Sequence, residues 1–168
     1  MTGQASDRTA PVVAAPVRAQ RDFERSFAAL DDIFAFVRSH LDARGAGEAD
    51  AYAIDLTIEE LFTNMVKYNA AGSGSIGIEI ELGPDAFTCR LTDPDSDRFD
   101  MTAAPDADIH QPVERRRPGG LGIHLVRRLV DSMEYDHSGR RSRVSFTRKL
   151  GGSGSERTLF DTEAGRAG

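Results

Sequence analysis

A stripe of polar side chains follows residues 55–69, which read DLTIEELFTNMVKYN. Glu60, Asn64 and Lys67 stand at i, i+4 and i+7, so they share one side of an α-helix that turns about 100° per residue. The opposite side carries apolar residues at helical spacing: Ile54, Ile58, Leu61, Phe62 and Met65. A carboxylate, an amide and an ammonium on one stripe could hold a magnesium phosphate, because Mg²⁺ takes hard oxygen ligands and an amine binds the anion as a point charge. The same pattern also fits an amphipathic helix with a solvated polar face, and this stretch alone does not separate the two.

A glycine cluster, Gly119-Gly120-Leu121-Gly122, opens a second run of apolar residues at helical spacing. The N–H groups and the positive dipole end at the start of a helix bind phosphate, and glycine lets the backbone come close to such a ligand. The cluster is not a Walker loop, because no Gly-Lys-Ser/Thr follows, and its spacing is not that of a dinucleotide fingerprint. It is a candidate phosphate site, with a flexible entry to a helix as the alternative.

Asp93 stands at the end of a predicted strand, where its carboxylate could accept a hydrogen bond from an adenine amino group. A single aspartate at such a position is also a common turn residue. The 25 or so residues that follow, about 94–118, show no periodicity. A loop of that length inside a compact domain is usually a lid, a binding loop or a disordered piece.

Periodicity predicts six elements of regular structure. Helical spacing predicts helices over residues 23–41, 49–68 and 121–133, and alternation predicts strands over 76–82, 87–91 and 144–150. Gly83-Pro84-Asp85 predicts the turn of a hairpin between the first two strands. This order lacks the rhythm of parallel βαβ units. It indicates an α+β fold, a two-layer sandwich with helices on one face of a sheet.

Composition predicts one domain, over residues 19–150 of the 168, because 39% of the residues are hydrophobic. Residues 1–18 read as a flexible leader or weak edge strand, and residues 151–168 as a flexible Gly/Ser-rich tail. A net charge of -6 argues against direct binding of nucleic acid. The single cysteine excludes an intramolecular disulfide, and no segment has the pattern of a signal peptide or a membrane span. We expect a cytoplasmic protein whose partner is a protein or a small molecule.

Three stretches, taken in this order, resemble the sequence boxes of the histidine-kinase-like ATPases, the superfamily with the Bergerat (GHKL) fold. EELFTNMVKYN resembles the N-box, TDPDSDRFD the first glycine box in altered form, and GGLGIHLVRRLVDSMEY the second glycine box. Within the superfamily the chain is most similar to the stand-alone anti-sigma-factor serine/threonine kinases, over about residues 23–150. The resemblance implies an α/β sandwich with a mixed, mainly antiparallel sheet.

The resemblance also implies a role for each matching residue. Glu60 stands at the position of the general base for the attacking hydroxyl, and Asn64 at that of the magnesium-binding asparagine. Asp93 matches the aspartate that reads the adenine amino group of ATP. The other matching positions belong to the nucleotide site: Lys67, Tyr68, Gly119, Gly120, Leu121 and Gly122.

The implied activity is that of a protein kinase that uses ATP and Mg²⁺ and takes part in partner switching. Such a kinase binds a sigma factor, phosphorylates a Ser or Thr of an anti-sigma antagonist of the STAS type, forms homodimers, and needs neither a membrane nor direct contact with nucleic acid. One departure from the family is Asp95, which stands where the first glycine box has glycine, so we expect a negative side chain near the nucleotide. This departure favours an alternative function, a binding module of the same fold that acts through protein contacts alone. A detached histidine-kinase catalytic domain is a third interpretation, which the lack of a dimerising helix with a phosphoacceptor histidine disfavours.

Overall fold

The computed structural model describes residues 15–69, 71–98, 100 and 120–151. The bounds of its elements are β1 Val17–Phe23, η1 Phe27–Ala29, α1 Leu30–Ala43, α2 Glu48–Tyr68, β2 Ile76–Leu82, β3 Ala86–Asp93, α3 Gly120–Leu129, β4 Ser132–Ser138 and β5 Arg141–Lys149. Most of the predicted loop over 94–118 lies outside the described residues. So do the predicted leader up to residue 14 and the predicted tail from residue 152.

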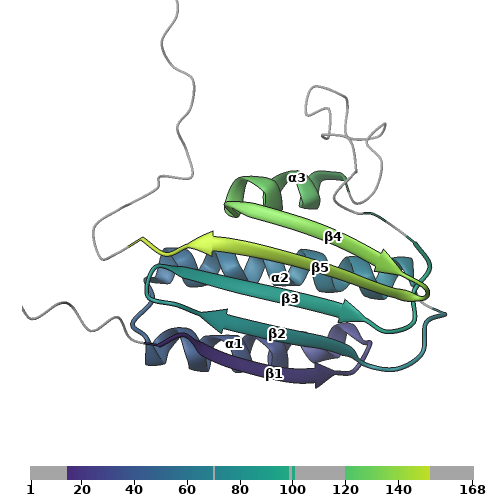
Figure 1. Cartoon of the computed structure of the whole chain (residues 1–168), viewed down its shortest axis with the longest axis horizontal. Helices are drawn as coiled ribbons and strands as arrows, with labels where there is room; N and C mark the ends of the chain where they lie inside the picture. Colours follow the sequence, from purple (N-terminus) through teal and green to yellow (C-terminus); the bar gives the residue numbers. More distant parts are fainter. Residues whose placement is uncertain (1–14, 70, 99, 101–119, 152–168) are drawn as a thin grey trace, which may run out of the picture.

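A five-stranded sheet in the order β1-β2-β3-β5-β4 forms one layer of the molecule (Figure 1). Each of the four neighbouring pairs among these strands is antiparallel. The helices α1, α2 and α3 form the second layer, on one face of the sheet (Figure 1). The predicted α+β sandwich with a mainly antiparallel sheet is therefore confirmed.

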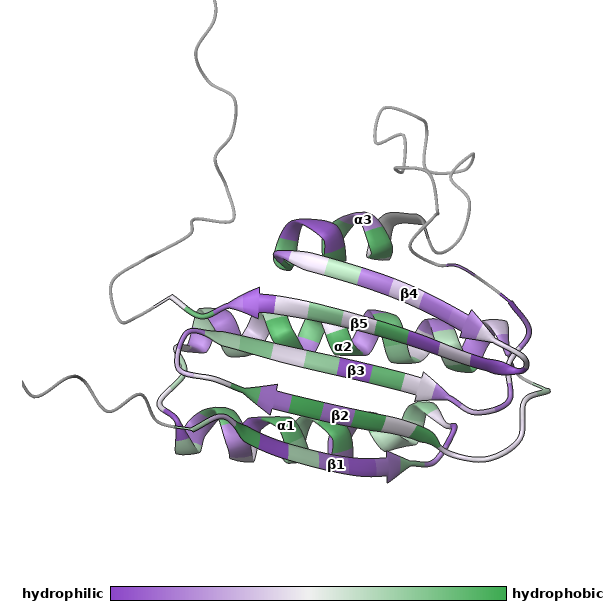
Figure 2. Cartoon of the chain, viewed as in Figure 1, coloured by the Kyte–Doolittle hydropathy of each residue, from purple (hydrophilic) through white to green (hydrophobic). Residues whose placement is uncertain are grey.

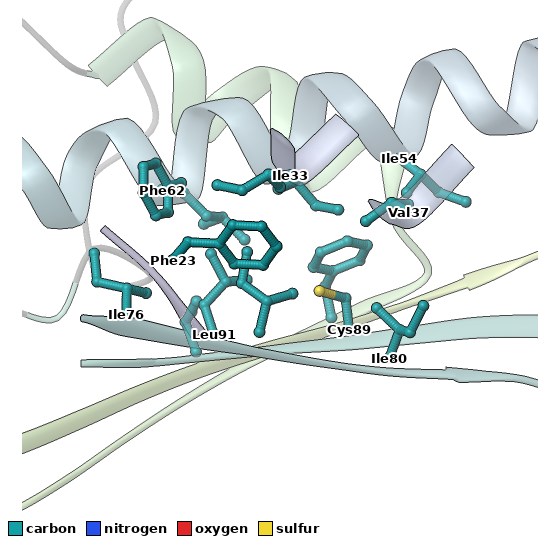
Figure 3. Close-up of a cluster of buried hydrophobic side chains, with 14 of the residues drawn as sticks. Phe23, Ile33, Val37, Ile54, Phe62, Ile76, Ile80, Cys89 and Leu91 are labelled. Atoms are coloured by element: carbon teal, nitrogen blue, oxygen red, sulfur yellow. The ribbon is translucent and has the colours of Figure 1, made fainter. Parts of the chain in front are cut away.

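The core lies between the sheet and the helices, because alternate side chains of β2, β3 and β5 are buried. Along β2, for example, Ile78 and Ile80 are buried and Glu79 between them is not, so polar and apolar residues alternate along the strand (Figure 2). All five apolar residues predicted for the inner side of α2 belong to this core, which also takes in α1 and the inner face of β3 (Figure 3). Each fully buried Leu, Ile or Phe contributes about 1.5–3 kcal/mol to folding, so the core fixes α2 firmly over the sheet.

A buried ion pair anchors the beginning of α2. Arg148 of β5 donates from Nε and Nη2 to Oδ1 of Asp50, at 2.9 and 2.6 Å. The same guanidinium donates from Nη1 to the carbonyl oxygen of Leu129, the last residue of α3. One arginine therefore ties together the two helices, α2 and α3, that carry most of the predicted site residues.

The start of the first predicted helix was wrong. Phe23 ends the edge strand β1, which pairs with β2 from Val17 opposite Leu82 to Phe23 opposite Ile76. Ser26 then caps η1 by accepting a hydrogen bond from the N–H of Ala28, and α1 begins only at Leu30. The spacing of the apolar residues from 23 to 30 imitates a helix, but pairing with β2 satisfies the backbone groups of an otherwise exposed segment.

The end of the last predicted helix was also wrong. α3 ends at Leu129, and Met133 lies in β4, opposite Phe146 of β5. β4 is a second edge strand, mostly polar and nowhere fully buried, so its sequence carries only a weak strand pattern. Gly139, at φ +61°, then makes the turn into β5. None of the helices among the described residues is both long enough and apolar enough to cross a membrane.

Candidate functional site

Glu60 and Asn64 of α2 are covered by neighbouring parts of the chain. The carboxylate of Glu60 packs against Gly122 in the first turn of α3: a Cβ atom added to Gly122 would lie 1.9 Å from Oε2 of Glu60. The side chain of Asn64 is buried, with 2% of its surface exposed. Lys67 and Tyr68, at the end of the same helix, are exposed. The alternative of a solvated polar face therefore holds for Lys67. It does not hold for Glu60 or Asn64, which neighbouring parts of the chain cover.

A small cavity of about 20 Å³ lies where the end of α2 meets the end of β3 and the start of β5. Asn64, Tyr68 and Asp93, three of the predicted site residues, lie in its wall, and its other lining residues are Met65, Asn69, Ser96, Asp97 and Ser142. This volume holds about one water molecule. The structure thus brings the N-box and the aspartate at the end of β3 together, around this small space.

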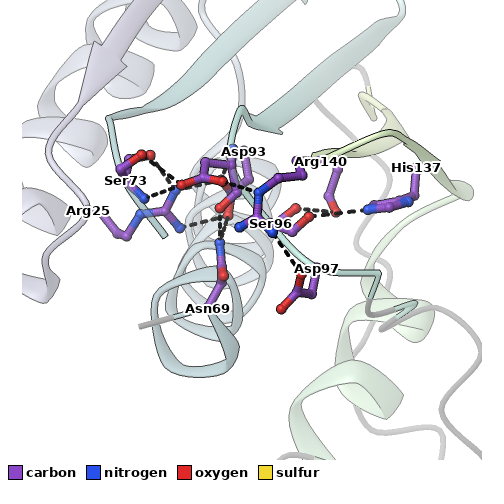
Figure 4. Close-up of polar contacts among 10 residues, drawn as sticks. Arg25, Asn69, Ser73, Asp93, Ser96, Asp97, His137 and Arg140 are labelled. Atoms are coloured by element: carbon purple, nitrogen blue, oxygen red, sulfur yellow. Dashed lines mark hydrogen bonds and ion pairs between the residues drawn. The ribbon is translucent and has the colours of Figure 1, made fainter. Parts of the chain in front are cut away.

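Asp93 is fully engaged in hydrogen bonds (Figure 4). Arg25 donates from Nη1 to Oδ2 at 2.7 Å and from Nη2 to Oδ1 at 2.5 Å. Oδ2 also accepts from Nδ2 of Asn69 at 3.0 Å, and Oδ1 from the backbone N–H of Asp95 at 3.1 Å. Burial by itself raises the pKa of Asp93, but the bonds from Arg25, Asn69 and the N–H of Asp95 outweigh it, so the pKa is lowered. The carboxylate is ionised and uses all of its roughly four acceptor positions.

Asp95, the residue in place of a family glycine, has its carboxylate bonded to Ser73 and Arg140. Its Oδ2 accepts from the N–H and the hydroxyl of Ser73, and its Oδ1 accepts from Nε of Arg140 (Figure 4). These bonds from Ser73 and then Arg140 lower the pKa of Asp95. Although Asp95 follows Asp93 closely, its carboxylate is not among the groups that line the cavity. The expected negative side chain is thus present, but its charge is balanced by Arg140.

The glycine cluster is only partly described. Gly120 is the first residue of α3 and Leu121 the second, whereas Gly119 lies outside the described residues. Only Gly122 makes a contact that can be assigned, the one with Glu60. The sequence reasoning assigned no role to Arg25, Asn69, Ser73 or Arg140, although Asn69 is the last residue of the stretch that resembles the N-box.

Comparison with known proteins identifies the family. The family described as histidine kinase-like ATPase domain matches residues 23–148, three quarters of the chain. The chain belongs to this family. Of the curated proteins, the serine-protein kinase RsbW of Halalkalibacterium halodurans is 29% identical over 89 residues, which are 51% of this chain and 54% of RsbW. This histidine kinase-like ATPase domain thus spans about half the length of that relative.

Two solved structures share the fold of this histidine kinase-like ATPase domain. One contains the RsbU and RsbW domains of a Mycobacterium tuberculosis protein, with a TM-score of 0.58 and 18% identity, over 80% of this chain and 32% of that one. The other is the SiaB-SiaC complex of Pseudomonas aeruginosa, with a TM-score of 0.52 and 17% identity, over 78% of this chain and 89% of that one. At these identities the likeness is one of fold.

Histidine kinase-like ATPase domains use ATP, and the donor set of this site suits Mg-ATP. Asp93 suits an amino group once one of its four present donors leaves, and Asn64 offers an amide oxygen, a hard ligand that Mg²⁺ accepts. Gly122 leaves room beside Glu60 that any side chain would fill. Within the described residues, no group of three or more His, Cys, Asp or Glu side chains could hold a metal by itself, so Mg²⁺ here would need ligands from phosphates and water as well.

Proposed function

We propose that the chain is an ATP-dependent anti-sigma serine/threonine kinase. In this proposal it binds a sigma factor and phosphorylates an anti-sigma antagonist of the STAS type in a partner-switching pathway. It would work in the cytoplasm, as a homodimer, without direct contact with nucleic acid or a membrane. The family and the name of the curated relative support the kinase part of the proposal.

The observation that carries this proposal is the contact between Glu60 and Gly122. The carboxylate of Glu60 occupies the space that a Cβ at residue 122 would need, so glycine at this position lets the carboxylate lie against α3. Glu60 therefore has a defined place between the N-box helix and the start of α3, where backbone N–H groups and the helix dipole favour negative charge. A base in that place could accept the proton of a hydroxyl group from a bound partner.

The other residues have binding roles in this proposal. ATP supplies the γ-phosphoryl group when it is bound, with Mg²⁺ to neutralise its charge. Asn64 would provide one oxygen ligand to Mg²⁺, and Asp93 would accept a hydrogen bond from the adenine amino group. The positions nearest the phosphates would be Lys67, Tyr68, Gly119, Gly120, Leu121 and Gly122.

A binding module without useful catalysis is the second candidate function. The engagement of both oxygens of Asp93 and the small volume of the cavity favour it, because a nucleotide needs a free acceptor and a pocket of several hundred Å³. In this form the domain would act through protein contacts alone.

Transfer of labelled γ-phosphate from Mg-ATP to a STAS-type antagonist, measured beside Mg-ATP binding, tests the proposal. Transfer that Glu60→Gln reduces strongly, while binding persists, would support the kinase. Stable binding of the antagonist or a sigma factor without nucleotide binding or transfer would support the binding module instead.

A further inference from the structure

Arg25 lies in the short segment between β1 and η1, far along the chain from the boxes of the family. Its side chain is nevertheless 8% exposed, and it reaches the end of β3 to form two hydrogen bonds with Asp93. Nη2 also approaches the carbonyl oxygen of Ser73 at 3.4 Å, and Nε is buried with no hydrogen-bond partner among the described residues. The guanidinium is thus held in place mainly by one residue, Asp93.

The same carboxylate is the group that the proposed function assigns to the adenine amino group. Its oxygens already receive four N–H donors, two of them from Arg25. An amino group can be accepted only after one of these donors leaves. Asn69 is fixed further by the bond from Nδ2 to the carbonyl oxygen of Asp95, and the backbone N–H of Asp95 cannot turn away without moving the strand end. Arg25, on a flexible side chain, is the donor that can leave.

We infer that Arg25 competes with the adenine base for Asp93 and thereby sets the affinity of this domain for adenine nucleotides. The inference rests on the proposed function insofar as it takes ATP as the ligand. In the closed state Arg25 neutralises Asp93; in the open state the guanidinium leaves Asp93, and Asn69 and the N–H of Asp95 still orient the carboxylate.

Whether the loss of Arg25 strengthens or weakens ligand binding separates competition for Asp93 from simple attraction between Arg25 and the phosphates. Removing a cation near a site for a polyanion weakens binding if the cation only attracts the phosphates. Removing a competitor strengthens binding, and it does so for any ligand that carries the adenine base, charged or neutral. Two hydrogen bonds to a buried charge are worth about tenfold or more in an equilibrium constant, so the gain is large enough to measure.

The test measures dissociation constants by calorimetry for the wild type and Arg25→Gln, with Mg-ATP, adenosine and inorganic tripolyphosphate as ligands. Arg25→Gln is expected to bind Mg-ATP and adenosine about tenfold more tightly, and to bind tripolyphosphate no more tightly than the wild type does. The matched control is Arg18→Gln. It removes an exposed arginine of β1 that pairs with Glu81 of β2, and it is expected to leave all three dissociation constants unchanged. Equal or weaker adenosine binding by Arg25→Gln would overturn the inference.

A measurement on the wild type covers the case in which Arg25→Gln does not fold, since it leaves Asp93 without its cation. The Nε–H resonance of Arg25, assigned by its loss in Arg25→Lys, which keeps a cation beside Asp93, is followed by NMR while adenosine is added. A change of that resonance at saturating adenosine supports the inference. An unchanged resonance, or no adenosine binding to either the wild type or the variant, overturns it.

The outcomes distinguish this inference from the proposed kinase. If the wild type transfers phosphate but Arg25→Gln binds adenosine no more tightly than the wild type does, the proposed kinase is supported and the competition by Arg25 is refuted. Tighter adenosine binding by Arg25→Gln without transfer by any variant would establish the competition and favour the binding module.

Discussion

The backbone of Gly122 in α3 lies against the carboxylate of Glu60 in α2, so closely that a Cβ atom would stand 1.9 Å from Oε2. The two residues come from different sequence boxes, 62 positions apart, and their contact makes α2 and α3 one unit at the site. Arg148 supports this arrangement at the far ends of the helices, through Asp50 and the carbonyl oxygen of Leu129.

Gly122→Ala is expected to displace Glu60 and to reduce phosphoryl transfer at least about tenfold. Alanine inside a helix would otherwise add roughly 0.5–1 kcal/mol of stability over glycine, so a loss of activity without a gain in stability points to the contact. The control for transfer is Gly47→Ala at the N-cap of α2, where an added Cβ meets nothing within 4 Å; it is expected to keep wild-type transfer. Transfer assays and thermal unfolding of both variants measure the effect; an active and stabilised Gly122→Ala would contradict it.

Glu60→Gln is expected to keep Mg-ATP binding and to lose about 10²–10⁴-fold in phosphoryl transfer, the usual contribution of a general base. Glutamine has nearly the same shape, so it fits beneath Gly122. Glu59→Gln, one position along on the exposed side of α2, is the control and keeps wild-type transfer. Robust transfer that survives in Glu60→Gln would refute the role of Glu60 as base.

Asn64→Ala is expected to abolish the dependence of ATP binding on Mg²⁺ while the protein stays folded. Its side chain lines the cavity rather than the apolar core, so removing it leaves the packing between α2 and the sheet intact. Calorimetry with ATP, in the presence and absence of Mg²⁺, measures the change. The assignment fails if the variant keeps both the affinity and the Mg²⁺ dependence of the wild type.

The inner side of α2 and the hairpin of β2 and β3 could be predicted because strict periodicity repeats over many buried residues. β1 and β4 could not, because an edge strand with few buried side chains has almost no pattern. Glu60, Asn64 and Asp93 were recognisable from local boxes. Arg25 was not, since it meets Asp93 across 68 positions of sequence, and only the fold creates that contact.

Arg148→Met is expected to lower the free energy of unfolding by about 3–5 kcal/mol, because it leaves the carboxylate of Asp50 buried without a cation. Restoring neutrality with the double variant Asp50→Asn/Arg148→Met should recover part of this loss. Arg18→Met breaks an ion pair that is exposed on both sides and serves as the control, with an unfolding free energy close to that of the wild type. Urea unfolding measures all of them, and equal losses for Arg148→Met and Arg18→Met would count against a buried anchor.

Asp95 and Asp55 are expected to change stability with pH in opposite directions. Bonds from Ser73 and Arg140 lower the pKa of Asp95 in the folded protein, so its ionised form stabilises the fold above the ordinary value of about 4. That stabilisation is lost as the pH falls from about 4 toward the lowered pKa. Burial raises the pKa of Asp55, and the bond from Arg38 offsets this only in part, so its ionised form costs stability at neutral pH, and the cost is relieved as the pH falls through the raised pKa. The wild type should therefore lose its stability advantage over Asp95→Asn as the pH falls. Relative to Asp55→Asn, the wild type should gain free energy of unfolding as the pH falls. Urea unfolding at a series of pH values from about 6 to 2 measures both, and parallel curves for wild type and Asp95→Asn would show that the bonds to Ser73 and Arg140 do not hold Asp95 in its ionised form.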